Sequence, residues 1–295
     1  MKEFEQALKR ARALMSDTPE ESKGAEDMSA NRPVTEETPT IDGAPRTLPL
    51  SAVVPPPEEF DTSLASGLPR LRADFTRFRE NFGAAKGAPQ SVDGAFRLLR
   101  TQVLSTMQER GAQVLGITSP AAGAGKTVTA IHLAMACARR TDQEVVLADF
   151  DFRRPAIAQY LGASGFQSSI QYFKGKGRLT DYLTTNEEGN LRFFLTDRSS
   201  EMSAEYLAGP RMDDALDEFV RSSRNTIVIA DLPPLIGCDD TIAMLPKLEA
   251  LLLVLASEES RHHDFERVIS LLPKEKLIGT VLNKVKGTSA HYDYY

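Results

Sequence analysis

The sequence predicts an α/β protein with a doubly wound, mostly parallel sheet and helices on both faces. Short apolar runs without polar alternation recur through the second two thirds of the chain, as expected for strands covered on both faces. Helical segments separate these runs, so strand and helix alternate. A glycine-rich loop joins the first run to the next helix, which is the usual place for a phosphate-binding loop in this class.

The 295-residue chain changes character near residue 90, and ten of its 17 prolines precede that point. The stretch from Ser16 to Pro57 is rich in Pro, Glu, Thr and Ser and has no sustained periodicity, which predicts a disordered linker. Helical patches are predicted at Met1–Met15 and Leu68–Phe82. The predicted parts are an N-terminal extension (residues 1–90), a P-loop domain (91–285) and a tyrosine-containing tail (286–295).

From residue 91 the predicted elements follow in regular order. The first is a helix over Val92–Glu109. Strands are predicted at Val114–Thr118, Val145–Asp149, Arg192–Thr196, Thr226–Asp231, Ala250–Ala256 and Ile278–Leu282. Helices between and after them are predicted at Thr127–Arg140, Pro155–Leu161, Met212–Ser223, Asp239–Leu245 and His262–Leu271.

The segment from Pro120 to Thr127 has the form of a phosphate-binding loop, with Pro120 in place of the first glycine of the strict pattern. Glycines let the backbone approach phosphate oxygens, and the following helix presents free N–H groups and a positive dipole end. Lys126 is expected to reach the β- and γ-phosphates, and Thr127 to offer its hydroxyl to Mg²⁺. The expected nucleotide contacts are Ala122, Gly123, Ala124, Gly125, Lys126, Thr127 and Val128.

Two later strands end in aspartate, one at Asp149 with Asp151 just beyond it, and the other at Asp231. In an open α/β sheet the ligand lies beyond the carboxyl ends of the strands, so these carboxylates are expected to converge on the loop. Carboxylate oxygens suit Mg²⁺. Arg153 is a candidate for added positive charge near the phosphates, although a surface ion pair is an equal alternative.

The formal net charge of −6 argues against a general nucleic-acid binder. The N-terminus does not have the form of a secretory signal, and no apolar run approaches the length of a membrane span. The two cysteines, Cys137 and Cys238, lie far apart in sequence, which is consistent with free thiols in a reducing cytoplasm.

The loop, the Asp149–Arg153 segment (Asp-Phe-Asp-Phe-Arg) and the Asp231–Pro234 segment (Asp-Leu-Pro-Pro) together resemble the bacterial tyrosine kinases of capsule and exopolysaccharide synthesis. The resemblance runs from about Ala95 to the C-terminus. It includes Phe96–Arg100, Gly279–Lys284 and the closing His291–Tyr295 segment (His-Tyr-Asp-Tyr-Tyr).

This resemblance implies an ATP- and Mg²⁺-dependent protein-tyrosine kinase that phosphorylates its own tail. It implies that Thr127 and Asp231 hold the metal, and that Asp149 and Asp151 orient and deprotonate the tyrosine and help order metal waters. Asn283 is a candidate for contact with the base, with a capping role as an equal alternative. The expected phosphorylation sites are Tyr292, Tyr294 and Tyr295.

The family's ring-forming helix carries Glu-x-x-Arg-x-x-Arg; this chain keeps Arg97 and Arg100 but has Gly94 at the glutamate position. We therefore predict self-association without assigning an octamer. About seven residues beyond the last strand give a reach of at most roughly 25 Å, which favours transfer in trans. The resemblance also implies a separate membrane-spanning activator, a phosphotyrosine phosphatase, and a cytoplasmic location at the inner face of the membrane.

Two alternatives stay open. One is an ATPase switch of the chromosome-partitioning or division-site type, but those proteins carry a signature lysine where this chain has Ala121. The other is a nucleotide-binding regulator without transfer activity, which the intact lysine and aspartates disfavour.

Overall fold

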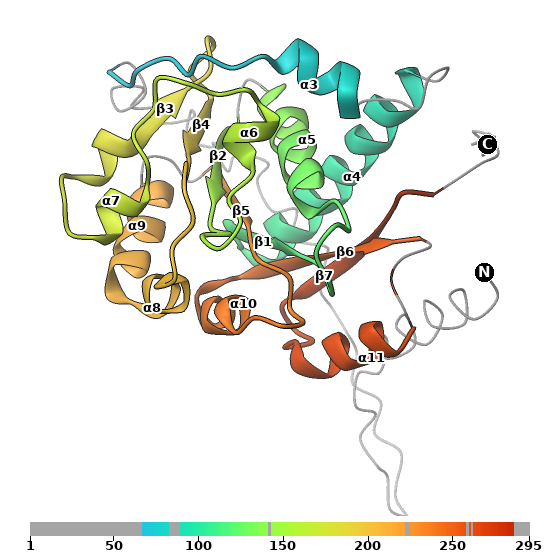
Figure 1. Cartoon of the computed structure of the whole chain (residues 1–295). Helices are drawn as coiled ribbons and strands as arrows, with labels where there is room; N and C mark the ends of the chain where they lie inside the picture. The colour runs from blue at the N-terminus through green and yellow to red at the C-terminus, as the bar shows by residue number, and fades with distance from the viewer. Residues whose placement is uncertain are drawn as a thin grey trace, which may run out of the picture. The chain divides into compact units, whose positions relative to one another are not determined.

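The computed structural model describes residues 67–82, 89–140, 143–221, 225–257, 260 and 262–285. At its centre is a seven-stranded sheet in the order β3-β4-β2-β5-β1-β6-β7 (Figure 1). All neighbouring strands pair parallel except β3, which is antiparallel to β4. The predicted mostly parallel α/β fold is confirmed. The strands are β1 (Val114–Thr118), β2 (Glu144–Asp149), β3 (Leu183–Thr185), β4 (Leu191–Phe194), β5 (Thr226–Asp231), β6 (Ala250–Ala256) and β7 (Leu277–Asn283).

The helices of the described residues follow the predicted alternation and add short elements that periodicity does not detect. They are α3 (Phe75–Phe82), α4 (Pro89–Arg110), α5 (Lys126–Ala138), α6 (Ile157–Tyr160), α7 (Ile170–Phe173), α8 (Ser203–Ala208), α9 (Pro210–Arg221), α10 (Asp240–Met244) and α11 (His262–Leu271), with 3-10 turns η1 (Leu179–Tyr182) and η2 (Leu245–Lys247). The unpredicted β3, α7 and α8 are three, four and six residues long, too short to show a period. No helix in these ranges has the length and apolarity to cross a bilayer.

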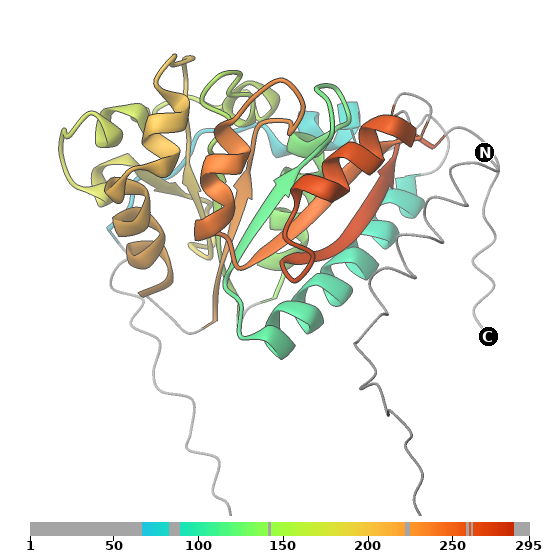
Figure 2. The ribbon, with the colours of Figure 1, turned by 90° about the horizontal axis from the view of Figure 1, so that it is seen from below.

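Helices cover both faces of the sheet, as adjacent residues of β4 demonstrate (Figure 2). The ring of Phe193 packs 6.0 Å from Phe75 of α3, whereas the ring of Phe194 packs 5.3 Å from Phe219 of α9. Successive side chains of a strand point to opposite faces, so α3 and α9 cover opposite sides. Burial on both faces explains the apolar, non-alternating strands.

The start of the packed region lies before the boundary predicted at residue 90. Leu71 and Phe78 are buried in the core cluster with residues of α5 and the sheet. The predicted helix over 68–82 is shorter than expected, because Leu71 donates its N–H to the Thr185 carbonyl and the side chain of Asp74 accepts from the Arg77 N–H at the helix start. The predictions for 1–15, 16–57 and the tail tyrosines fall outside the described residues.

Candidate nucleotide and magnesium site

The glycine-rich loop connects the end of β1 to the start of α5. Gly123 and Gly125 have φ values of 86° and 92°, a region that favours glycine. A Cβ on Gly125 would lie 2.0 Å from Nδ2 of Asn283, so the close approach of β7 also requires glycine here. Helix α5 has no side-chain cap at Gly125, and its first N–H groups have no acceptor within the helix. The loop therefore offers backbone donors to an anion.

The sheet register brings the predicted side chains together. Asp149 and Asp231 end the neighbouring parallel strands β2 and β5 and are register partners. Lys126 Nζ lies 2.7 Å from Asp151 Oδ2 and 3.4 Å from Asp231 Oδ1. The Thr127 hydroxyl donates to Asp231 Oδ2 at 2.6 Å. One ammonium, one hydroxyl and two carboxylates thus share a single site beside the loop.

Burial dominates the electrostatics of this site. Asp149 and Asp231 are fully buried and Asp151 is 3% exposed. Burial raises the pKa of Asp149 well above its ordinary value, and the Asp231 carboxylate adds to the shift. Burial also raises the pKa of Asp231, although the charge of Lys126 opposes it. Burial lowers the pKa of Lys126, but the carboxylates of Asp231 and Asp151 outweigh it, so the net pKa lies above the ordinary value.

This donor set fits Mg²⁺. Among the described residues, Lys126 alone forms ion pairs with this carboxylate cluster. When all three carboxylates are ionised, the one ammonium leaves two negative charges in a low-dielectric site, a state that a bound divalent cation would stabilise. The hydroxyl and carboxylate oxygens of Thr127, Asp151 and Asp231 are the hard ligands that this ion prefers. Asp149 Oδ1 is buried without a hydrogen-bond partner, which adds an acceptor to the same site.

Asp149 and Asp151 have different neighbours, a difference that sequence reasoning did not resolve. Asp149 Oδ2 accepts hydrogen bonds from the N–H groups of Ala156 and Ile157, both at 3.0 Å, at the start of α6. Asp149 therefore anchors the segment between β2 and α6. Asp151 Oδ1 accepts from the Arg154 N–H at 3.0 Å, while its Oδ2 faces Lys126. Of the two, only Asp151 forms an ion pair with Lys126.

Arg153 is paired with a carboxylate that sequence analysis assigned to a helix start. Its Nε lies 2.9 Å and its Nη2 lies 2.8 Å from the carboxylate oxygens of Asp240, whose side chain is fully buried. The same Nη2 lies 3.4 Å from Asp239 Oδ1. The bond to Asp240 raises the pKa of Arg153 above its ordinary value. Ligand atoms of Cys238, Asp239 and Asp240 lie within 4.8 Å of one another, and Arg153 already pairs with both of these carboxylates. No residue spacing links Arg153 to Asp240, so sequence analysis missed this partner.

Asn283 holds the loop itself. Its Nδ2 donates to the Ala124 carbonyl at 2.9 Å, and its Oδ1 accepts from the Lys284 N–H at 2.8 Å. Both polar atoms of the side chain are engaged with backbone. These bonds join the end of β7 to the loop backbone at Ala124.

The chain is similar in sequence to known nucleotide-binding proteins. Residues 115–295 match the CobQ/CobB/MinD/ParA nucleotide binding domain. The chain belongs to this family. EpsB of Ralstonia solanacearum, which bears the name of a tyrosine-protein kinase, is 27% identical over 223 residues, covering 74% of this chain and 29% of EpsB. The tyrosine-protein kinase YwqD of Bacillus subtilis is 24% identical over 211 residues, covering 70% of this chain and 88% of YwqD.

Among solved structures, the kinase domain of the Escherichia coli tyrosine kinase ETK is 25% identical with a TM-score of 0.62, covering 72% of this chain and 84% of that domain. The predicted resemblance to the bacterial tyrosine kinases is therefore confirmed as distant homology within the nucleotide-binding family. The chain spans less than a third of the length of EpsB, at 29%.

Proposed function

We propose that this protein is an ATP- and Mg²⁺-dependent protein-tyrosine kinase that phosphorylates its own tail at Tyr292, Tyr294 and Tyr295. The observation that carries the proposal is the cluster of Lys126, Thr127, Asp151 and Asp231 at the start of α5. Distant homology to tyrosine-protein kinases supports the choice of acceptor.

The loop residues Ala122 to Val128 would cradle the phosphates through backbone N–H groups. Bound Mg²⁺ supplies positive charge against the negative charge that develops on the phosphoryl oxygens. Thr127 and Asp231 would hold the metal, and Asp151 would order one of its waters. Lys126, which pairs with Asp151 in this structure, would turn toward the β- and γ-phosphates.

That exchange of partners leaves Asp151 Oδ2 free to accept the proton of the incoming tyrosine hydroxyl. We assign Asp149 to positioning, because one of its oxygens already accepts two backbone N–H groups of α6. Arg153 could add charge near the phosphates only after leaving Asp240. We assign Asn283 to holding the loop backbone at Ala124.

Incubation of the purified chain with Mg-ATP, followed by mass spectrometry, tests the proposal. We expect phosphate on the tail tyrosines, and none in a Lys126→Met variant or in a chain that ends at Ala290. ATP hydrolysis by the intact chain with no tyrosine labelled would instead support the partitioning-type switch. Binding of nucleotide with neither hydrolysis nor labelling would support the regulator.

Transfer in trans and self-association form a separate part of the proposal. A Lys126→Met chain with an intact tail, mixed with an active chain that ends at Ala290, should become phosphorylated. Absence of label in that mixture, while the intact active chain labels itself, would show transfer in cis.

We further propose that a separate membrane-spanning activator recruits this protein to the inner face of the cell membrane, that a phosphotyrosine phosphatase reverses the reaction, and that the cycle regulates exopolysaccharide or capsule polymerisation and export. The support is the sequence resemblance to the kinases of that process, together with distant homology to the tyrosine-protein kinases EpsB and YwqD. Residues 1–15 are the proposed docking helix. Unchanged membrane recruitment after their deletion would refute that assignment.

A further inference from the structure

Residues 67–82, which we call the strap, cross the edge of the sheet at β3 and lead into α3 (Figure 1). Their extended part bonds to the edge strand on both sides of one residue. Thr185 donates its N–H to the Pro69 carbonyl at 3.0 Å, and Leu71 donates its N–H to the Thr185 carbonyl at 2.8 Å. Arg70 and Thr185 thereby form a parallel bridge, which covers part of the open edge of β3.

The strap then reaches the end of α6. The Ser164 N–H donates to the Arg72 carbonyl at 2.9 Å, and the Asp74 N–H donates to the Leu161 carbonyl at 2.8 Å. The start of α6 is held by Asp149, which accepts two backbone N–H groups there. The stretch between β2 and the bridge to the strap is thus fixed at both ends, and it contains the second aspartate of the nucleotide site.

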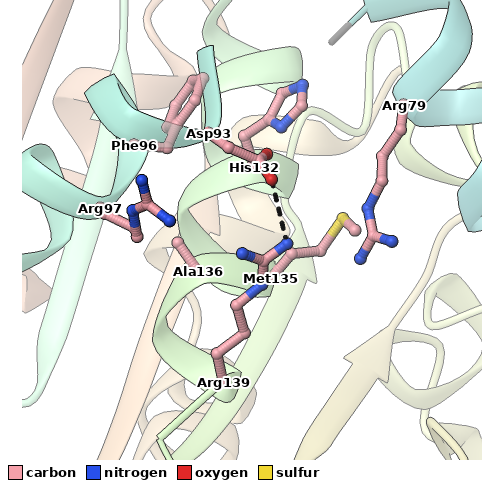
Figure 3. Close-up of a pocket in the computed structure, with 8 residues that line it drawn as sticks. All are labelled: Arg79, Asp93, Phe96, Arg97, His132, Met135, Ala136 and Arg139. Atoms are coloured by element: carbon pink, nitrogen blue, oxygen red, sulfur yellow. Dashed lines mark hydrogen bonds and ion pairs between the residues drawn. The ribbon is translucent and has the colours of Figure 1, made fainter. Parts of the chain in front are cut away.

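The strap also packs on the helix that begins at the phosphate-binding loop. Phe78 of α3 is fully buried, and its ring lies 4.8 Å from the ring of His132 in α5. Phe96 of α4 stacks on the same histidine with centroids 4.6 Å apart, and Figure 3 shows these two rings side by side. Helix α5 starts with Lys126. The strap therefore contacts both segments that supply the nucleotide site.

Few side chains hold the strap in place. Among its residues, Leu71 and Phe78 alone are buried, and most of the others are exposed. An element with few buried apolar contacts opens locally at a lower free-energy cost than the rest of a domain. Detachment of the strap therefore does not require the sheet to unfold.

We propose that the strap is a regulatory clamp on the nucleotide site. When seated, it holds the segment that follows β2 in place, and when drawn off, it weakens the binding of Mg-nucleotide. The strap directly follows the N-terminal extension, so a partner that binds the extension acts on the site through the strap. Linkage requires that bound nucleotide in turn favours the seated strap. The clamp depends on the nucleotide site and not on the proposed transfer to tyrosine.

Amide hydrogen exchange of the full chain, with and without Mg-ADP, tests this reciprocal effect without any substitution. We expect Mg-ADP to slow exchange in residues 69–74 at least about fivefold. Helix α9, on the face of the sheet opposite α3, is the internal reference and should not change.

A substitution in the strap tests the other direction. Leu71→Asp places a charge at a buried position and should detach the strap. We expect exchange in residues 156–164 to rise at least about tenfold, since two hydrogen bonds from the strap are lost, and the affinity for fluorescent Mg-ADP to fall at least about fivefold. Thr76→Asp is the matched control, because it introduces the same charge at an exposed position of the strap.

A second pair of variants tests the route through α6. Asp149→Ala should speed exchange in residues 69–74, whereas Asp151→Ala should not, because only Asp149 bonds to the start of α6. A structural role of the strap alone gives no reason for this difference.

Four results would overturn the proposal. Exchange in the strap that is unchanged by bound Mg-ADP would show that the two are not coupled. Equal loss of affinity in Thr76→Asp and Leu71→Asp would assign the effect to charge. Exchange in Leu71→Asp that rises as much in α9 as in residues 156–164 would show general loss of stability. Equal effects of Asp149→Ala and Asp151→Ala on the strap would exclude α6 as the route.

None of these measurements uses tail labelling. Failure of the proposed kinase activity therefore leaves the test of the clamp intact, and failure of the clamp leaves the kinase proposal intact.

Discussion

Replacement of Gly125 by alanine tests the argument that two separate constraints act at the phosphate-binding loop. The φ of 92° costs an alanine about 1–2 kcal/mol. The new Cβ would also meet Asn283 Nδ2 at 2.0 Å, so the amide has to move and lose its 2.9 Å bond to Ala124, which costs about 1 kcal/mol more. We expect Gly125→Ala to lower the free energy of unfolding by about 2–3 kcal/mol in all.

Urea unfolding of a double-mutant cycle of Gly125→Ala and Asn283→Ala measures the part of the cost that comes from the clash with Asn283. Gly111 is the matched control for the backbone part, because it has a φ of 64° and no atom within 4 Å of an added Cβ. Gly111→Ala should therefore lose only the backbone part. In the Asn283→Ala background the clash is absent, and Gly125→Ala should cost about 1 kcal/mol less than in the native chain. Costs that add within about 0.5 kcal/mol would refute the claim that Asn283 and Gly125 are in contact.

Three further predictions concern charge and packing. Lys126→Met should destabilise the chain by about 3–5 kcal/mol near neutral pH, since it leaves buried carboxylates uncompensated. Folding already raises the pKa values of Asp149 and Asp231, so these carboxylates take up protons as the pH falls; the loss should therefore shrink as the pH is lowered from neutral in chemical denaturation, and a constant loss would contradict this account. Arg153→Met should destabilise more than Asp240→Asn in the same assay, because only the former leaves a fully buried carboxylate unpaired; the reverse order would contradict the burial difference. Phe78→Ala should cost about 3–5 kcal/mol, whereas Phe82→Ala on the same helix should cost much less because Phe82 is 37% exposed; equal costs would show that α3 is not part of the core.

Local pattern was sufficient for the central sheet and for the phosphate-binding loop. Six of the strands are long enough to show as apolar runs, and five of them are buried on both faces, whereas the edge strand β7 is only partly buried. The three-residue β3 is too short for such a signal. The helix of Leu68–Phe82 was predicted seven residues too early, since the Leu71 backbone bonds to Thr185, more than a hundred residues away. Pairing over such a separation leaves no periodicity in the local sequence.

The contacts of the candidate site also fall into two groups, those that could be expected from the sequence and those that could not. Asp149, Asp151 and Asp231 follow strands, and strand ends meet at one edge of a parallel sheet, so their association with Lys126 could be expected from the sequence. The partner of Arg153 could not, because Asp240 belongs to a helix 87 residues away. Nor could the different bonds of the two nearby aspartates, which depend on how the backbone turns after β2.

The sequence alone determined the strand–loop–helix unit, the residue types around the phosphate site and the class of fold, because each depends on neighbours within a few residues or on a general property of parallel sheets. Only the tertiary structure decided that Asp149 anchors α6, that Asp240 holds Arg153, and that Asn283 bonds to Ala124 beside Gly125. These contacts join side chains from separate elements. Their distances are set by how the helices and strands pack, which no short stretch of the chain encodes.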